Sequence, residues 1–123
     1  MGQSQPFKQV ALVVEDDPLQ RETIVTLLEE SEMDVIQCES AEAAELVLEH
    51  VGGCLTTLLT DVNLAGSMDG IELAQIAHDR FPDLRIIVIS ASPRVSRLPD
   101  GTQFIAKPWR PLELLREARP WQH

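Results

Sequence analysis

The sequence predicts an α/β protein in which short strands alternate with helices around a parallel sheet. Two observations carry this prediction. Short apolar runs recur along the chain, and segments with apolar residues at helical spacing separate them. Four of the runs also end in charged or hydroxyl side chains, which is typical of strands whose carboxyl ends meet at one edge of a parallel sheet.

Five strands are expected, each because a short run of apolar and β-branched residues is bounded by polar or turn residues. They cover residues 10–14, 33–38, 55–60, 84–89 and 102–106.

Four helices are expected between and after these strands. Pro18 suits the first turn of the first helix, and Ser40 offers an N-cap for a second helix over 41–51. Apolar spacing predicts a third helix over 70–81, which a proline stops, and a last one over about 111–118.

The segment 91–101 lies where one more helix would complete the alternation. Pro93, Pro99 and Gly101 leave room for about one to two helical turns there. We therefore expect a short, irregular fourth helix around 95–98, or none.

The composition excludes several classes of protein. The chain has 123 residues, 44% of them hydrophobic and 24% charged, which is typical of one globular domain. The net charge of −10 argues against nucleic acid or an anionic membrane as a partner, and no window approaches the roughly 18 apolar residues of a membrane span. Cys38 and Cys54 fit no metal or redox spacing, so we expect buried thiols in a cytoplasmic protein.

Polar residues at the ends of four strands form the candidate site: Glu15, Asp16, Asp61, Ser90 and Lys107. A carboxylate held rigidly at a strand end can act as a nucleophile and form an acyl phosphate. Three converging carboxylates repel one another unless a hard cation such as Mg²⁺ joins them. An ammonium and a hydroxyl at the same edge would contact phosphoryl oxygens. These residues predict a site for a divalent cation and a phosphoryl group.

Each of these residues also has a plainer interpretation. A strand-terminal Asp often caps a loop, and an acidic string before a helix often serves as its N-terminal cap. We assign the cap to Asp17 alone, which precedes Pro18, because a cap needs one acid and the string contains three. Glu15 and Asp16 are then left to face the metal.

Four strings of residues together resemble the receiver domain of two-component response regulators. They are 13–18, 60–64 with Asp69-Gly70 downstream, 89–91 and 104–108. The match covers essentially the whole chain, so we expect a single receiver domain over 1–123 with a core at about 8–119. The resemblance implies a five-stranded, doubly wound, flavodoxin-like sheet in the order 2-1-3-4-5.

The resemblance also implies the chemistry. It makes Asp61 the phosphoacceptor and Lys107 the cation that contacts the phosphoryl oxygens. Mg²⁺ would be held by Glu15, Asp16 and Asp61 and by the backbone carbonyl of Asn63.

The resemblance further implies a conformational switch and partners. The Ser90 hydroxyl would move toward the phosphoryl group while the Phe104 ring turns inward. The phosphoryl group would come from a histidine of a sensor kinase or phosphotransfer protein, since no histidine lies in the four strings. We expect a stand-alone signalling domain that relays to an output protein. Self-phosphotransfer and slow autodephosphorylation would be intrinsic to it, and it would not be an enzyme in the usual sense. The oligomeric state stays open.

Two features depart from the family's pattern. Glu15 stands where Asp is commoner, which leaves the affinity for metal open. The segment 91–101 is short and contains Arg94 and Arg97, which puts the family's usual partner-binding face in doubt. We hypothesise that this segment is an irregular loop whose shape reports phosphorylation; the alternative is that it merely closes the fold.

The residues disfavour three other functions. A Mg²⁺-dependent phosphatase would need a second acid two residues after the nucleophile, where this chain has Asn63, and a cap that no segment could form. A receiver-like binding module that is not phosphorylated is disfavoured because every chemical position is filled. A flavodoxin-like cofactor binder is disfavoured because the first loop is acidic.

Overall fold

The computed structural model describes residues 9–92 and 97–118 of the chain. The elements, in chain order, are β1 (Val10–Val14), α1 (Pro18–Glu30), β2 (Asp34–Cys38), α2 (Ala41–Val51), the 3-10 helix η1 (Gly52–Cys54), β3 (Thr57–Asp61), α3 (Gly70–Arg80), β4 (Arg85–Ser90), β5 (Gln103–Ala106) and α4 (Pro111–Ala118). None of these described helices is both long and apolar enough to cross a bilayer.

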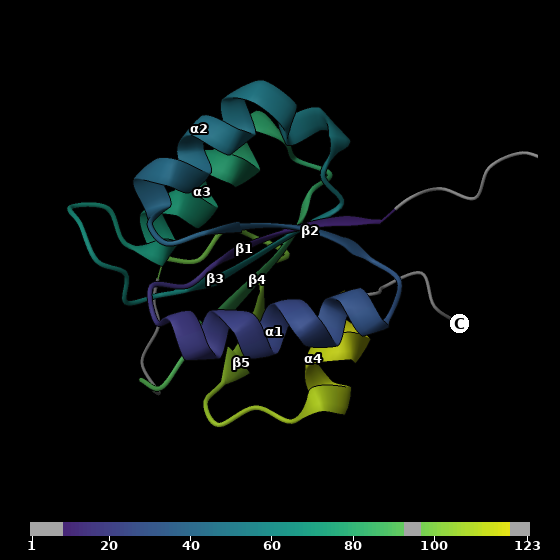
Figure 1. Cartoon of the computed structure of the whole chain (residues 1–123). Helices are drawn as coiled ribbons and strands as arrows, with labels where there is room; N and C mark the ends of the chain where they lie inside the picture. Colours follow the sequence, from purple (N-terminus) through teal and green to yellow (C-terminus); the bar gives the residue numbers. More distant parts are fainter. Residues whose placement is uncertain (1–8, 93–96, 119–123) are drawn as a thin grey trace, which may run out of the picture.

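The five strands form one parallel sheet in the order β2-β1-β3-β4-β5. Helices α1 and α4 lie on one face of the sheet, and α2 and α3 lie on the other (Figure 1). The expected doubly wound α/β fold and its strand order are therefore confirmed.

Two apolar layers enclose the sheet. The layer toward α2 and α3 contains Leu12, Leu58 and Leu73, and the layer toward α1 and α4 contains Ile87 and Leu114. All five side chains are fully buried, and each such burial contributes roughly 1.5–3 kcal/mol. Because both faces of the central strands are covered, these strands read as nearly continuous apolar runs.

Most strand boundaries lie one or two residues later than the sequence predicts. Leu55 and Leu84 are buried, as strand residues would be, but their N–H groups bond back into the preceding turns. Asp61 and Ser90 are the last residues of β3 and β4, whereas the sequence predicted that they would come just after these strands.

The segment 91–101 is only partly described. Leu98 and Pro99 lie in no helix or strand, and residues 93–96, which hold half of the expected short fourth helix, lie outside the described residues. The described part contains no helix, which agrees with a helix that is irregular or absent.

One expectation about the cysteines is wrong. Cys38 is buried at the end of β2, but Cys54 is exposed. Cys54 ends the surface turn η1, and two residues separate it from the next strand, so its side chain does not reach the sheet.

Backbone hydrogen bonds just beyond the strand ends connect the segments at the carboxyl edge of the sheet. The N–H of Glu15 donates to Cys38 O over 3.1 Å, that of Val62 to Ile89 O over 3.0 Å, and that of Lys107 to Ser90 O over 2.9 Å. The ladder of the sheet thus continues one residue past three strands, which fixes the backbone from which the polar side chains project.

Candidate functional site

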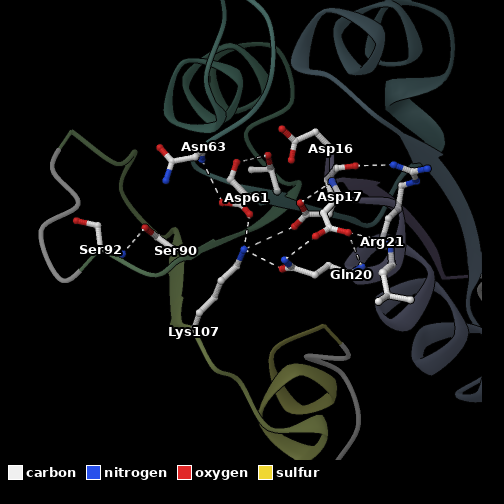
Figure 2. Close-up of polar contacts among 12 residues, drawn as sticks. Asp16, Asp17, Gln20, Arg21, Asp61, Asn63, Ser90, Ser92 and Lys107 are labelled. Atoms are coloured by element: carbon white, nitrogen blue, oxygen red, sulfur yellow. Dashed lines mark hydrogen bonds and ion pairs between the residues drawn. The ribbon is translucent and has the colours of Figure 1, made fainter.

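Asp61 and Lys107 form an ion pair at the carboxyl edge of the sheet. The Nζ atom of Lys107 donates to Oδ2 of Asp61 over 2.5 Å, and Asp61 is 6% exposed (Figure 2). The other carboxylate oxygen, Oδ1, accepts the N–H of Asn63 over 3.1 Å. A nearly buried carboxylate that has one charged and one neutral donor is held in a single orientation.

Glu15 lies beside this pair at the end of β1. It is 3% exposed, and its Oε1 is 3.8 Å from Nζ of Lys107. Burial, reinforced by Asp61, raises the pKa of Glu15 to about 7, although the N–H of Asp17 and the charge of Lys107 act in the opposite direction. This carboxyl therefore carries a proton part of the time near neutral pH, and a cation beside it would favour the charged form.

The next two acidic residues, Asp16 and Asp17, accept hydrogen bonds from different parts of the backbone. Asp16 is exposed, and its Oδ2 accepts the N–H of Ala65 over 3.0 Å. Asp17 is the N-cap of α1, because its Oδ1 accepts the N–H groups of Leu19 and Gln20 over 2.9 and 3.4 Å. The assignment of the cap to Asp17 is confirmed.

Lys107 has a further partner that the sequence did not reveal. Its Nζ donates to Oε1 of Gln20 over 3.0 Å, and Nε2 of Gln20 donates to Oδ2 of Asp17 over 3.2 Å. Burial alone would lower the pKa of Lys107, but the bond and charge of Asp61, with Glu15 and Asp16, raise it above its ordinary value. Lys107 is therefore an ammonium at neutral pH.

The sequence marks Gly70 as part of a motif, and the structure gives this glycine a steric role. A Cβ on Gly70 would lie 1.9 Å from the carbonyl oxygen of Asp61 and 3.0 Å from Oγ1 of Thr60. The N–H of Gly70 also donates to Val62 O over 2.8 Å. The first turn of α3 can therefore approach the end of β3 this closely only if residue 70 is glycine.

Ser90 and Phe104 lie on neighbouring strands. Ser90 is fully buried, and its Oγ accepts the N–H of Ser92 over 3.0 Å. The register pairs Ser90 with Ala106 and Val88 with Phe104, so the Ser90 and Phe104 side chains leave the same face of the sheet. The ring of Phe104 is 40% exposed.

Asn63 is exposed just beyond β3. In Figure 2 its side chain points away from Asp61 and Lys107, while its backbone N–H reaches the Asp61 carboxylate. Its side chain thus stays clear of the carboxylates, and only its backbone contacts the site.

The donor set fits Mg²⁺ in part. Among residues 9–92 and 97–118, no three acidic, histidine or cysteine side chains are arranged to hold a metal by themselves. Lys107 contacts the Asp61 carboxylate and approaches that of Glu15, where a cation would otherwise balance their charge. Mg²⁺ needs only one or two carboxylates and keeps several waters, so these oxygen donors suit it.

A separate cavity of about 700 Å³ lies near the opposite ends of the strands. Its two arginines already have partners, because Arg80 pairs with Glu45 over 3.3 Å and Arg85 with Glu117 over 2.9 Å. The cavity contains none of the residues at the carboxyl edge, so we place the candidate site at that edge.

Comparison with known proteins agrees with this geometry. Residues 11–119 match the family model for the response regulator receiver domain. The chain is 32% identical over 111 residues to the response regulator receiver protein CpdR of Brucella abortus, covering 86% of this chain and 90% of that one. It is 30% identical over 115 residues to the transcriptional regulatory protein AruR of Pseudomonas aeruginosa, covering 88% of this chain but only 47% of AruR.

A solved structure has the same fold. The CheY-like response regulator receiver domain protein from Methanospirillum hungatei superposes with a TM-score of 0.82 at 22% identity, covering 92% of each chain.

Proposed function

Because the chain belongs to the response regulator receiver family, we propose that it relays signals by accepting a phosphoryl group on Asp61. The observation that carries the proposal is the contact between Asp61 and Lys107: a nearly buried carboxylate at the end of a central strand, with an ammonium 2.5 Å away. An isolated surface Asp would not be held in this way. Here the nucleophile and the group that neutralises phosphoryl oxygens stand side by side.

The reaction needs little beyond positioning. One carboxylate oxygen of Asp61 attacks the phosphorus of a phosphohistidine on a partner, the P–N bond breaks, and the imidazole leaves with its electron pair and takes up a proton. Lys107 shifts from the carboxylate to the phosphoryl oxygens as their charge builds up. The N–H of Asn63 keeps the other Asp61 oxygen in place.

Receiver domains generally bind Mg²⁺ at an acidic pocket. In this chain Glu15, Asp16, Asp61 and the backbone carbonyl of Asn63 would hold it. The ion would neutralise the carboxylates and the phosphoryl oxygens. The buried Glu15 supports this assignment, because a nearby cation would stabilise the charged form of its desolvated carboxyl.

Phosphorylation would act on Ser90 and Phe104. A dianionic group on Asp61 is a stronger acceptor than any present at rest, so the Ser90 hydroxyl would turn to donate to it. That movement would loosen the bond from Ser92 and open space on the face of the sheet that Phe104 shares. The exposed Phe104 ring could then turn inward, which changes the surface that a partner meets.

The partners proposed here follow from the family. Receiver domains interact with histidine kinases or phosphotransfer proteins and with output domains. We propose a sensor kinase or phosphotransfer protein as the donor and an output protein as the target, both in the cytoplasm. We further propose one receiver domain over 1–123, with no nucleic-acid or membrane partner and with intrinsic, slow autodephosphorylation.

The test is intact-mass analysis after incubation with Mg²⁺ and acetyl phosphate. Wild-type protein should gain one phosphoryl group, and Asp61→Asn or wild type with excess chelator should gain none. An adduct that persists in Asp61→Asn would refute Asp61 as the acceptor. If a phosphorylated histidine donor also leaves the wild type unmodified, the chain is a receiver-like module that binds without phosphorylation.

A further inference from the structure

The loop between β3 and α3, residues 62–69, contacts the candidate site at two points. The N–H of Asn63 donates to Oδ1 of Asp61 over 3.1 Å, and the N–H of Ala65 donates to Oδ2 of Asp16 over 3.0 Å. Both acceptors are carboxylates that a metal ion would recruit. The loop's conformation and the metal site are therefore coupled, because a ligand oxygen that turns toward a cation has less to offer the loop.

A third carboxylate holds the same loop from elsewhere in the fold. Oε2 of Glu42, in the first turn of α2, accepts the N–H of Ser67 over 3.1 Å, the Ser67 hydroxyl over 3.0 Å and the N–H of Met68 over 3.0 Å. Gly66 adopts a left-handed conformation with φ of 103°, and a Cβ there would lie 2.8 Å from Oε1 of Glu42. The loop is thus shaped around this carboxylate.

Helix capping does not explain Glu42. Helix α2 already has an N-cap, because Oγ of Ser40 accepts the N–H of Ala43 over 3.1 Å. An acidic residue in the first turn would interact favourably with the helix dipole even if its carboxylate faced solvent. The Glu42 carboxylate instead accepts three bonds from a loop 25 residues away. Its own backbone N–H and the Ser67 hydroxyl hold the pKa of Glu42 below its usual range, so it stays charged.

We infer that Glu42 is a positioning residue for the metal site. It anchors loop 62–69 to α2, and it thereby keeps Asn63 and Ala65 beside Asp61 and Asp16. This inference rests on the proposed function, because it assumes that those two aspartates bind Mg²⁺. When Asp16 turns toward the metal, the Glu42 anchor remains, and the loop does not have to be ordered again before phosphoryl transfer.

Two replacements of Glu42 by side chains of similar length distinguish the effect of its hydrogen bonds to the loop from the effect of its packing. Glu42→Met removes the acceptor, and Glu42→Gln keeps one carbonyl oxygen that can still accept from Ser67 and Met68. Glu49→Met is the matched control, because Glu49 is exposed on the same helix and the charge change is identical. Two quantities are measured for each: hydrogen exchange of the loop amides without metal, and the Mg²⁺ dissociation constant from an amide chemical-shift titration.

In Glu42→Met, the Ser67 and Met68 amides should exchange about tenfold faster. The Mg²⁺ dissociation constant should rise on the order of tenfold, as for other residues that support metal ligands. Glu42→Gln should restore most of the slow amide exchange and most of the Mg²⁺ affinity of the wild type. Glu49→Met should match the wild type in both quantities. Should Glu42→Met fold poorly, Ser67→Ala removes only the hydroxyl bond and should raise the dissociation constant about two- to threefold.

Each outcome decides the matter. Faster loop exchange with an unchanged Mg²⁺ affinity would overturn the inference, since Glu42 would then hold the loop without serving the metal. A Glu42→Gln variant as weak as Glu42→Met would overturn it as well, because the acceptor would not be the cause. Wild-type protein that binds no Mg²⁺ would refute the proposed metal site itself, and the inference with it.

Discussion

Replacing Glu15 by Gln is expected to stabilise the metal-free protein at neutral and higher pH. The Glu15 carboxyl is 3% exposed, and burial, with Asp61 adding to it, raises its pKa from 4.5 to about 7. The folded chain therefore binds this proton more tightly than the unfolded chain. Between these two pKa values the unfolded state has already released the proton, so the free energy of unfolding falls as the pH rises.

The size of the effect follows from the same pKa. A change from 4.5 to about 7 corresponds to about 3 kcal/mol of folding free energy. Wild-type protein should lose this amount once the pH exceeds about 7, and Glu15→Gln should lose none of it. The variant should thus be about 2–3 kcal/mol more stable than the wild type near pH 8 and nearly equal to it near pH 4.5.

The assay is urea unfolding followed by far-ultraviolet circular dichroism, in excess chelator, at a series of pH values between about 4.5 and 8. Comparing the two proteins at each pH removes the contributions of Asp17 and Glu42, whose lowered pKa values act at more acidic pH. Parallel stability curves for wild type and variant would refute the reasoning. Saturating Mg²⁺ should reverse the order, because the ion stabilises the charged Glu15 and gains less from an amide.

Three further predictions follow from the site geometry. Gly70→Ala should destabilise the fold by about 1–3 kcal/mol in urea unfolding, because its Cβ would overlap the Asp61 carbonyl oxygen. Gly53→Ala, whose Cβ would meet nothing within 4 Å, should change stability by less than about 0.5 kcal/mol, and equal effects would contradict the steric argument. Lys107→Met should slow phosphorylation by acetyl phosphate on the order of 100-fold. It should also tighten Mg²⁺ binding in a titration, since no ammonium then competes for Asp61; weaker binding would be inconsistent with that competition. The Mg²⁺ affinity of the wild type should rise about tenfold between about pH 6 and pH 8, because the metal displaces a proton from Glu15; an affinity independent of pH would exclude Glu15 as the titrating ligand.

The fold was predictable because its signals are local. The strand β1 and the helices α2 and α4 begin and end close to where the apolar runs, the Ser40 cap and the prolines indicate, and α1 begins where Asp17 and Pro18 indicate. Strand ends were less certain, since Leu55 and Leu84 are buried in turns and look like strand residues in the sequence. The exposure of Cys54 was not predicted, because a short 3-10 turn has no distinct pattern in the sequence.

From the sequence, only the residues of the candidate site at the strand ends were predictable. Parallel strands bring their carboxyl ends together, so Glu15, Asp61 and Lys107 could be placed side by side without coordinates. The partners supplied by helices could not, because they depend on how each helix is rotated and which rotamer a long side chain adopts. Gln20 and Glu42 belong to this group, as each reaches its partner across a large sequence separation.

The ion pair between Lys107 and Asp61 means that the proposed phosphoacceptor already has a charged partner in the resting protein. The carboxylate that would attack phosphorus is already engaged, and its partner has to be drawn away before a new bond forms. A divalent cation supplies the replacement charge, and a phosphorylated donor supplies new oxygens for the ammonium. On the proposed function, phosphorylation would therefore require the cation and the donor together. Removing magnesium would leave the domain unphosphorylated even with a phosphodonor in excess.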